Sequence, residues 1–331
     1  MAKVLVSEKY LHDIANAIRV KLDSQSTYTP AQMAAAIADI TGSISGTITP
    51  STDADKVLVT DSNLTAIANA IRAKLDVATT YTPAQMADAI LSIQASGPTI
   101  VPWSSGTDEE VAAMIDAAHA GTIDLQQDGG WAIGDIRTIR INAFTAGGNV
   151  AVSSQDIDIA ISSFDDYMSC GCAMQFDFAN AMTEWIRMNN EHTNVGGYGS
   201  SEMKITTLPA LINALPLWLR ERLIEFSCLA SAGNNSSTIE TITGNKLALR
   251  SEIEVLGTTI MSYSGEGSQL SYYTINENKT KRRGHNGNYN NWFLRSPDKG
   301  YTTRYCYISG AGSINDTGAA STELLAPFGC L

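Results

Sequence analysis

Apolar residues recur with helical spacing in the first part of the chain. They lie three or four positions apart and therefore share one helix face: Leu11, Ile14, Ile18 and Leu22. A short apolar run at residues 4–6 predicts a strand before this helix. A second helix is expected after residue 29, with an apolar stripe formed by Met33, Ile37 and Ile40. The pattern predicts a small strand–helix–helix unit.

The start of the second helix carries a capping signal. Thr29 suits the N-cap, Pro30 the first helical position and Gln32 the third, which together form a capping box. The whole unit returns 53 positions later, since Lys3-Val-Leu-Val6 is repeated as Lys56-Val-Leu-Val59 and the Tyr-Thr-Pro-Ala-Gln-Met run is repeated with it. The first hundred residues are therefore a tandem duplication.

Each repeat is too small to bury its apolar stripe alone. We expect it to pack on the other repeat or on a neighbouring chain. Packing between chains predicts a homo-oligomer, held in part by four isoleucines: Ile14, Ile18, Ile67 and Ile71. Stretches rich in Gly, Ser, Thr and Pro flank the second repeat and predict linkers. The expected order is module 1–41, linker 42–55, module 56–94 and linker 95–106.

From residue 107 onward the pattern is mixed. Residues 108–120 predict an Ala-rich helix that Thr107 or Asp108 caps and Gly121 ends. Helices are also expected at 176–188 and at 208–226, where Pro216 kinks or divides the second of them. Alternating or apolar runs predict strands at 131–135, 136–144, 157–161, 246–249, 291–294 and 305–308. The expected class is α+β, with helical-hairpin modules followed by one mixed domain at 107–331.

The charge and the apolar content of the chain exclude two kinds of partner, nucleic acid and the membrane interior. Of the 331 residues, 34 are acidic and 22 are Lys or Arg, which gives a net charge of −12. An acidic surface repels a phosphate backbone, so nucleic acid is not expected as a partner. The one basic cluster, at residues 279–283, is interpreted as a solvated loop. No apolar run approaches the roughly 18 residues that span a bilayer, so we expect no membrane insertion. We also expect no signal peptide, because the first residues lack an apolar core.

Metal and redox chemistry find little support in the sequence. The five cysteines form no CxxC pair: Cys170, Cys172, Cys228, Cys306 and Cys330. Cys170 and Cys172 are too close for an ordinary disulfide, so all five are expected to be reduced and mostly buried. The histidines are scattered, without a partner at metal-ligand spacing: His12, His119, His192 and His285. We therefore expect no metal and no cofactor.

Hydrolytic chemistry is weakly indicated as well. No GxSxG nucleophile elbow occurs in the sequence. Asp156 and Asp158 share one face of a predicted strand, and Asp165 is followed by Asp166. Either pair could supply the two carboxylates of a glycosidase, but a solvated strand face is the simpler interpretation. The chain is expected not to be an enzyme.

Binding is better supported, by the residues near the C-terminus. Asn and Tyr offer adaptable hydrogen bonds and rigid contact area at low entropic cost. The candidate ligand-binding residues are Asn288, Tyr289, Asn290, Tyr301, Arg304, Tyr305 and Tyr307. Strand alternation places Tyr305 and Tyr307 on one face, which is expected to meet solvent or ligand, whereas Trp292 is expected in the core. The loop at 196–201 is the next candidate.

Seven motifs follow one another in the C-terminal part. They are Trp131-x-x-Gly134-Asp135, Gly196-Gly-Tyr-Gly-Ser-Ser201, Leu215-Pro216, Leu249-x-Ser251-Glu-x-Glu254, Glu266-Gly-x-Gln269, Asn291-Trp-Phe-Leu-Arg-Ser-Pro297 and Tyr307-Ile308 with Gly312. Together they resemble an uncharacterised family of C-terminal domains in phage and prophage tail proteins and some bacterial surface proteins. That family has a Trp-Leu-Arg-Ser-Pro stretch and a Val-Arg-Pro-Ala-Phe ending. This chain ends instead on Leu325-Ala-Pro-Phe328 and lacks the arginine of that ending.

The N-terminal repeats resemble helical modules of tail proteins from phages of Gram-positive gut bacteria. The family ending is also similar to that of the C-type-lectin-like and formylglycine-generating fold, which retroelement-diversified phage adhesins use. These resemblances imply a virion protein of the phage tail, made in the host cytoplasm. Because tail fibres usually work as trimers, they also imply that the expected homo-oligomer is a homotrimer. It would bind a host cell-surface glycan or protein through a lectin-like C-terminal domain and other tail proteins through its N-terminal modules. A bacterial surface binding protein of the same family and a surface-glycan-degrading enzyme are the alternatives.

Overall fold

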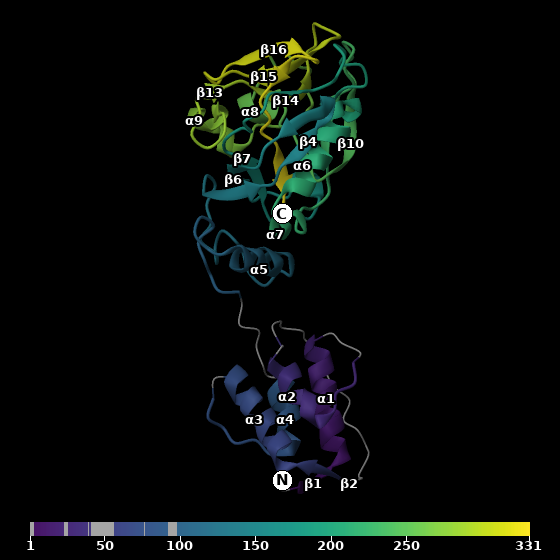
Figure 1. The fold of residues 1–331 in the computed structure, drawn as a ribbon, viewed down its shortest axis with the longest axis vertical. Helices are drawn as coiled ribbons and strands as arrows, with labels where there is room; N and C mark the ends of the chain where they lie inside the picture. Colours follow the sequence, from purple (N-terminus) through teal and green to yellow (C-terminus); the bar gives the residue numbers. More distant parts are fainter. Residues whose placement is uncertain (1–2, 23–25, 39, 41–55, 76, 92–97) are drawn as a thin grey trace. The chain divides into compact units, whose positions relative to one another are not determined.

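The structure is a computed structural model that describes residues 3–22, 26–38, 40, 56–75, 77–91 and 98–331 (Figure 1). It divides into two compact units, residues 1–97 and 98–331. The two predicted modules therefore belong to one N-terminal unit. The predicted linker 42–55 and the first part of the linker 95–106, residues 95–97, lie outside the described residues.

The N-terminal unit contains the two repeats in corresponding conformations. Its elements are β1 (Lys3–Ser7), α1 (Glu8–Leu22), α2 (Pro30–Ala38), β2 (Lys56–Thr60), α3 (Asp61–Leu75) and α4 (Pro83–Leu91). The predicted strands and helices are present, and one of the two bonds of the predicted capping box is made, since the Thr29 backbone N–H donates to Gln32 Oε1 at 2.9 Å. The Gln32 N–H donates to the Thr29 carbonyl instead of the Thr29 hydroxyl. β1 pairs antiparallel with β2, and the register sets Leu5 opposite its repeat equivalent Leu58.

The helices of the two repeats pack crosswise. α1 contacts α4 and α2 contacts α3 more extensively than either contacts its own hairpin partner. Ile14 and its equivalent Ile67 are both fully buried, as are Ile18 and Ile71. The prediction that these four isoleucines hold an oligomer together is therefore wrong, because each apolar stripe is covered by the other repeat of the same chain.

The C-terminal unit begins with one long helix and a run of strands. Its elements up to residue 231 are α5 (Asp108–His119), β3 (Ile136–Ile141), β4 (Phe144–Ala146), β5 (Val150–Val152), β6 (Gln155–Ser163), β7 (Gln175–Phe178), β8 (Ile186–Arg187), α6 (Leu208–Ala214), α7 (Leu217–Arg220) and β9 (Phe226–Ser231). Thr107, one of the two predicted caps, is the N-cap of α5, and it also forms a capping box with Glu110. Pro216 divides the predicted helix 208–226 into α6 and α7. Phe226, the last residue of the predicted helix, is the first residue of β9.

The rest of the unit is made of short elements. They are β10 (Ile239–Asn245), β11 (Leu247–Ala248), α8 (Glu252–Leu256), α9 (Asn276–Lys279), β12 (Lys281–Arg282), β13 (Tyr289–Asn290), β14 (Trp292–Pro297), β15 (Arg304–Ile308), β16 (Ile314–Gly318), β17 (Thr322–Glu323) and β18 (Phe328–Cys330). Within residues 98–331, which the structure describes throughout, the largest sheet has the strand order β11-β18-β7-β6-β3. A second sheet has the order β14-β15-β16 and lies with β13 at one end of the unit (Figure 1).

Three sequence predictions in this unit are wrong. Residues 176–188 contain most of β7, a loop and β8 rather than a helix, because β7 pairs with β18 on one side and β6 on the other. In β7 the polar Gln175 and Asp177 alternate with two phenylalanines, and all four side chains are buried. Residues 131–135 form a turn, in which Gly134 has φ 96° and the Asp135 carboxylate accepts the N–H of Ala132. The second part of the predicted linker, residues 98–106, packs into the unit: Trp103 is fully buried, with its ring centroid 5.2 Å from that of Trp131.

Three of the seven motifs that carry the family resemblance meet in a buried ionic network. Arg295, from the Leu-Arg-Ser-Pro stretch, donates to both carboxylate oxygens of Glu254, at 2.6 and 2.9 Å. Ser251 forms a capping box with Glu254 at the start of α8. The Ser296 hydroxyl donates to Glu266, which is itself buried. These motifs therefore build the core that holds β14 in place, and they do not form an exposed site.

A second buried pair lies beside the C-terminal Pro-Phe segment. Arg250 donates to Asp177 at 2.7 Å, and its guanidinium lies 3.5 Å from the ring centroid of Phe328. The Tyr273 hydroxyl donates to the same carboxylate at 2.6 Å. Although the arginine of the family ending is missing, a buried arginine–carboxylate pair does stand next to this ending, with the arginine supplied by residue 250.

Candidate functional site

The hairpin formed by β12 and β13, residues 281–290, has a firmly anchored base. The Lys281 ammonium is fully buried, donates to the Phe178 carbonyl at 2.7 Å and lies 5.3 Å from the ring centroid of Trp292. Burial lowers the pKa of Lys281 to about 8. In the turn, a Cβ on Gly287 would lie 2.0 Å from the Arg283 carbonyl oxygen, so the turn requires glycine there. The hairpin is therefore a defined element.

The tip of this hairpin presents cations and aromatic rings to solvent. The Arg282 guanidinium lies 4.4 Å from the ring centroid of Tyr289, whose side chain is 49% exposed. Arg283 lies 5.3 Å from the ring centroid of Trp185, which is 37% exposed. His285 is exposed and bonds through Nδ1 to Asp158 at 2.8 Å. We call Trp185, Arg282, Arg283, His285, Asn288 and Tyr289 the hairpin surface.

The other predicted ligand residues lie elsewhere. Tyr301 and Arg304 flank the start of β15, with the guanidinium 4.1 Å from the tyrosine ring centroid. Arg304 also donates to Asp316 of β16 at 2.7 Å. The side-chain amide of Asn194 fixes this loop by donating to the carbonyls of residues 301 and 304, at 2.8 and 2.9 Å. Strand β15 separates these residues from the hairpin, so the seven predicted residues do not form one site.

The predicted tyrosine face of β15 is only partly exposed. Alternation does place Tyr305 and Tyr307 on the same face, and Tyr307 is half-buried. Tyr305, however, is fully buried, because β15 is the middle strand of its sheet and the Asn189 segment covers this end of it. The prediction that Tyr305 meets solvent or ligand is wrong. Trp292 is fully buried, as predicted.

The loop at 196–201 is a structural element. Tyr198 is fully buried, and a Cβ on Gly197, which has φ 57°, would lie 2.2 Å from the Ser231 carbonyl oxygen. The glycines of this motif let the loop pass close to β9. Its motif therefore serves packing, and the loop is a poor candidate for a binding site.

A cleft of about 400 Å³ opens beside the buried network. Asp165, Asp166, Tyr167, Glu254 and Glu266 are among the residues that line it. The Tyr167 hydroxyl donates to Glu254 at 2.7 Å. Burial raises the pKa of Glu266 to about 7, although the Ser296 hydroxyl bond opposes this shift. Each of these two glutamates is held by bonds to neighbouring groups, Glu254 by Arg295 and Tyr167, and Glu266 by Ser296 and the N–H of Ser231.

The other carboxylate pair is also engaged in structural bonds. Asp156 accepts from Arg140 at 3.1 Å on the exposed face of β6. Asp158 accepts from the Thr138 hydroxyl at 2.7 Å and bonds to His285. The two carboxylates share a strand face, as predicted, but only Asp156 is exposed, whereas Asp158 is half-buried. Their bonds tie this face to β3 and to the hairpin.

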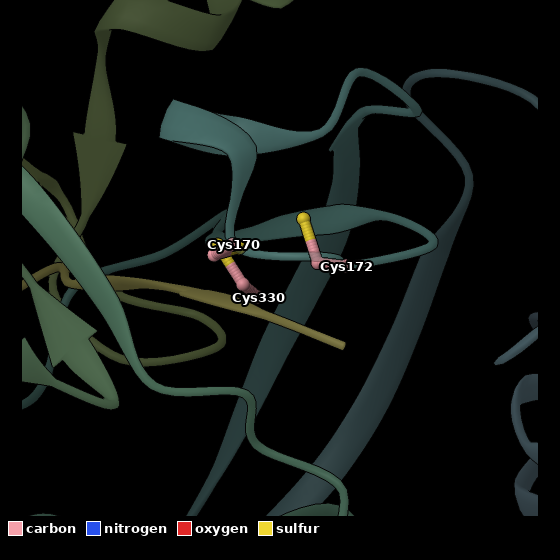
Figure 2. Close-up of side chains that lie close together, drawn as sticks. All are labelled: Cys170, Cys172 and Cys330. Carbon is pink, nitrogen blue, oxygen red and sulfur yellow. The ribbon is translucent and has the colours of Figure 1, made fainter.

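Three of the cysteines come together, which the sequence spacing did not indicate. Cys170, Cys172 and Cys330 have sulfur atoms within 4.8 Å of one another (Figure 2). A hydrogen bond from Cys330 is the main reason that the pKa of Cys172 falls to about 7, whereas burial raises the pKa of Cys170 to about 11. The close pair Cys170-Gly-Cys172 was the available signal, but only the fold brings Cys330 beside it.

In comparisons with known proteins, one family matches part of the chain. Residues 178–327 match a family described as a domain of unknown function, DUF6273. No curated protein and no solved structure matches the chain significantly. The matched range includes the hairpin surface and the Arg295–Glu254 pair, whereas Cys170, Cys172 and Cys330 lie outside it. Among the described residues, no helix combines the length and apolar character needed to cross a bilayer.

Proposed function

We propose that this chain is a phage or prophage tail protein that binds the host cell surface through its C-terminal unit. The observation that carries the proposal is the hairpin surface: two exposed arginines, each beside an exposed aromatic ring, on a hairpin with a buried base. Loops on a rigid scaffold are where recognition residues concentrate. Tyr, Trp and Arg are also the residues that dominate binding energies.

The chemistry of the hairpin surface suits a polar ligand. An aromatic ring offers its face to a sugar ring or an apolar side chain. A guanidinium offers paired donors to carboxylate or phosphate. The chain as a whole is acidic, with a net charge of −12, so the arginines of the hairpin surface are the groups that would attract an anionic group. A host cell-surface glycan or protein with such groups is the proposed receptor.

The remaining parts of the proposal concern the architecture. We propose that the C-terminal unit is C-type-lectin-like, which is supported by the return of the C-terminal strand β18 into the main sheet, between β11 and β7. The N-terminal unit would attach the chain to other tail proteins. A homotrimer remains our expectation for the particle, but surfaces other than the four buried isoleucines must then form its interface.

The proposal is tested with the full chain and intact bacteria. The labelled chain should bind cells of the bacterium that the particle infects, and an excess of it should reduce adsorption of the particles to those cells. Cells of an unrelated bacterium are the control. Saturable binding together with blocked adsorption supports the proposal. A chain that binds neither cell type, and that leaves adsorption unchanged, would refute it.

A further inference from the structure

The three clustered cysteines come from two segments that are far apart in the sequence. Cys170 and Cys172 lie in the loop between β6 and β7, and Cys330 lies in β18. β18 pairs with β7, which follows the loop, with Cys330 opposite Gln175. The C-terminal Leu331 carbonyl accepts the N–H groups of residues 173 and 174, at 2.6 and 3.0 Å. The backbone thus holds the C-terminal thiol beside the other two.

The loop has an unusual backbone that turns its two cysteines toward β18. Met168 and Ser169 both have positive φ, at 52° and 57°, and Gly171 follows at 84°. Left-handed conformations are costly for residues other than glycine and tend to cluster at functional sites. The Asp166 carboxylate stabilises the loop by accepting the N–H of Gly171 at 2.7 Å and that of Cys172 at 3.3 Å.

The spacing of the sulfur atoms fits a single metal ion. A metal–sulfur bond of about 2.3 Å places three ligands in a trigonal arrangement about 4 Å apart. The three sulfurs lie within 4.8 Å of one another, so they could reach this arrangement with shifts of less than about 1 Å. Cys330 is fully buried and Cys172 nearly so, whereas the half-buried Cys170 leaves a path from solvent. No other metal-ligating group among the described residues joins the three.

We propose that Cys170, Cys172 and Cys330 bind one thiophilic metal ion, Zn²⁺ or Cu⁺, through three thiolates. Soft thiolate ligands select these ions over Mg²⁺ or Ca²⁺. A third thiol within 4.8 Å distinguishes this arrangement from a simple disulfide pair, which would use two. The ion would tie the C-terminal strand to the loop 165–172, whose Asp165, Asp166 and Tyr167 line the cleft.

The test uses the full chain, stripped of metal by a chelator and kept reduced. Zn²⁺ and Cu⁺ are titrated separately in competition with chromophoric chelators, which shows which ion the site prefers. Cd²⁺ substitution should give an ultraviolet thiolate-to-metal charge-transfer band. We expect one ion per chain, a raised melting temperature on binding, and an X-ray absorption signature of three sulfur ligands. Cys172→Ser and Cys170→Ser should each weaken binding at least a hundredfold.

The matched control is Cys306→Ala, which removes a buried thiol outside the cluster. It should leave metal binding unchanged. Because the Cys170 side chain is half-buried, Cys170→Ser is the variant least prone to misfold, and circular dichroism verifies its structure. Failure of the reduced wild-type chain to take up either ion would overturn the proposal. It would also be overturned if Cys170→Ser bound metal as tightly as the wild type. A disulfide between two of the three cysteines, found by mass spectrometry and formed as readily with metal as without it, would overturn it as well.

Discussion

Lys281 and Arg282 are neighbours in the sequence with opposite environments. The ammonium of Lys281 is fully buried against aromatic rings and bonds to a backbone carbonyl, whereas Arg282 is exposed beside Tyr289. The basic cluster was interpreted from the sequence as a solvated loop, and this holds for Arg282 but not for Lys281. Alternation along a two-residue strand separates the anchoring side chain from the side chain that faces solvent.

Glu266 should make stability depend on pH. Burial raises the pKa of Glu266 from 4.5 to about 7, so the folded protein holds a proton that the unfolded chain releases between these pH values. Its contribution to stability is therefore fully present below pH 4.5 and is lost as the pH rises through 7. Glu266→Gln imitates the protonated form. We expect it to flatten the loss of stability between pH 5 and 8, measured by urea unfolding.

The control for this experiment is Glu277→Gln, at an exposed position in α9. It should retain the pH profile of the wild type. If Glu266→Gln lost stability between pH 5 and 8 as steeply as the wild type does, the buried carboxyl would not be the group that titrates.

The sequence places Tyr305 on a face that meets solvent or ligand, whereas the structure leads us to expect a role in stability. Because its ring is fully buried, Tyr305→Ala should leave a cavity and lower the free energy of unfolding by about 3 kcal/mol or more. Tyr289→Ala, at an exposed position, should change it by about 0.5 kcal/mol or less. Chemical denaturation of the two variants checks this difference. Equal effects would contradict the burial of Tyr305.

At the level of elements, the N-terminal unit behaves as two equivalent halves. Ile14 and Ile67 occupy matching, fully buried positions in α1 and α3. Ile14→Ala and Ile67→Ala should therefore destabilise this unit by similar amounts, about 2–5 kcal/mol each. Calorimetry of the full chain should show a lower first transition and an unchanged transition for the C-terminal unit. Markedly unequal effects, or a change of oligomeric state instead, would contradict the packing of one repeat on the other.

The sequence predicted those elements whose signals are local. The helix starts after Thr29 and Thr107 and the break at Pro216 depend on residues close in the chain, and the structure confirms them. The error at residues 176–188 has a tertiary cause. The polar–apolar alternation of β7 covers only four residues, and its two polar side chains, Gln175 and Asp177, are buried by bonds to the distant Arg250. The sequence likewise left open whether a repeat packs on its neighbour or on another chain, and the crosswise packing of α1 on α4 answers this within one chain.

Site prediction failed where distant segments meet. Asn288, Tyr289, Tyr301 and Arg304 were found from composition, but their separation by β15 is a property of the sheet. Trp185 was missed because nothing near it in the sequence indicates its contact with Arg283. Cys330 was missed as a partner of Cys170 for the same reason. Alternation correctly paired Tyr305 with Tyr307, but it could not show which face the rest of the chain covers.

The C-terminal unit has a buried scaffold and, distinct from it, an exposed surface that we propose for recognition. The motifs that resemble tail proteins form the scaffold, through Arg295, Glu254 and Glu266. Breaking such a buried ion pair leaves a charge without a partner, so Arg295→Ala is expected to cost about 3–5 kcal/mol and to abolish binding only through unfolding. Thermal melting monitored by circular dichroism distinguishes such a variant from one that alters recognition alone. A folded Arg295→Ala variant with an unchanged melting temperature would contradict the scaffold role.

The central claim, that the hairpin surface binds the host cell, is tested most directly by measuring how tightly full-length variants bind intact host cells. The triple variant Arg282→Ala, Arg283→Ala and Tyr289→Ala should bind at least tenfold more weakly, with a melting temperature close to that of the wild type. The matched control, Tyr301→Ala with Arg304→Ala, removes an arginine–tyrosine pair from the far end of β15 and should bind as the wild type does. A triple variant that binds host cells as tightly as the wild type would contradict the claim.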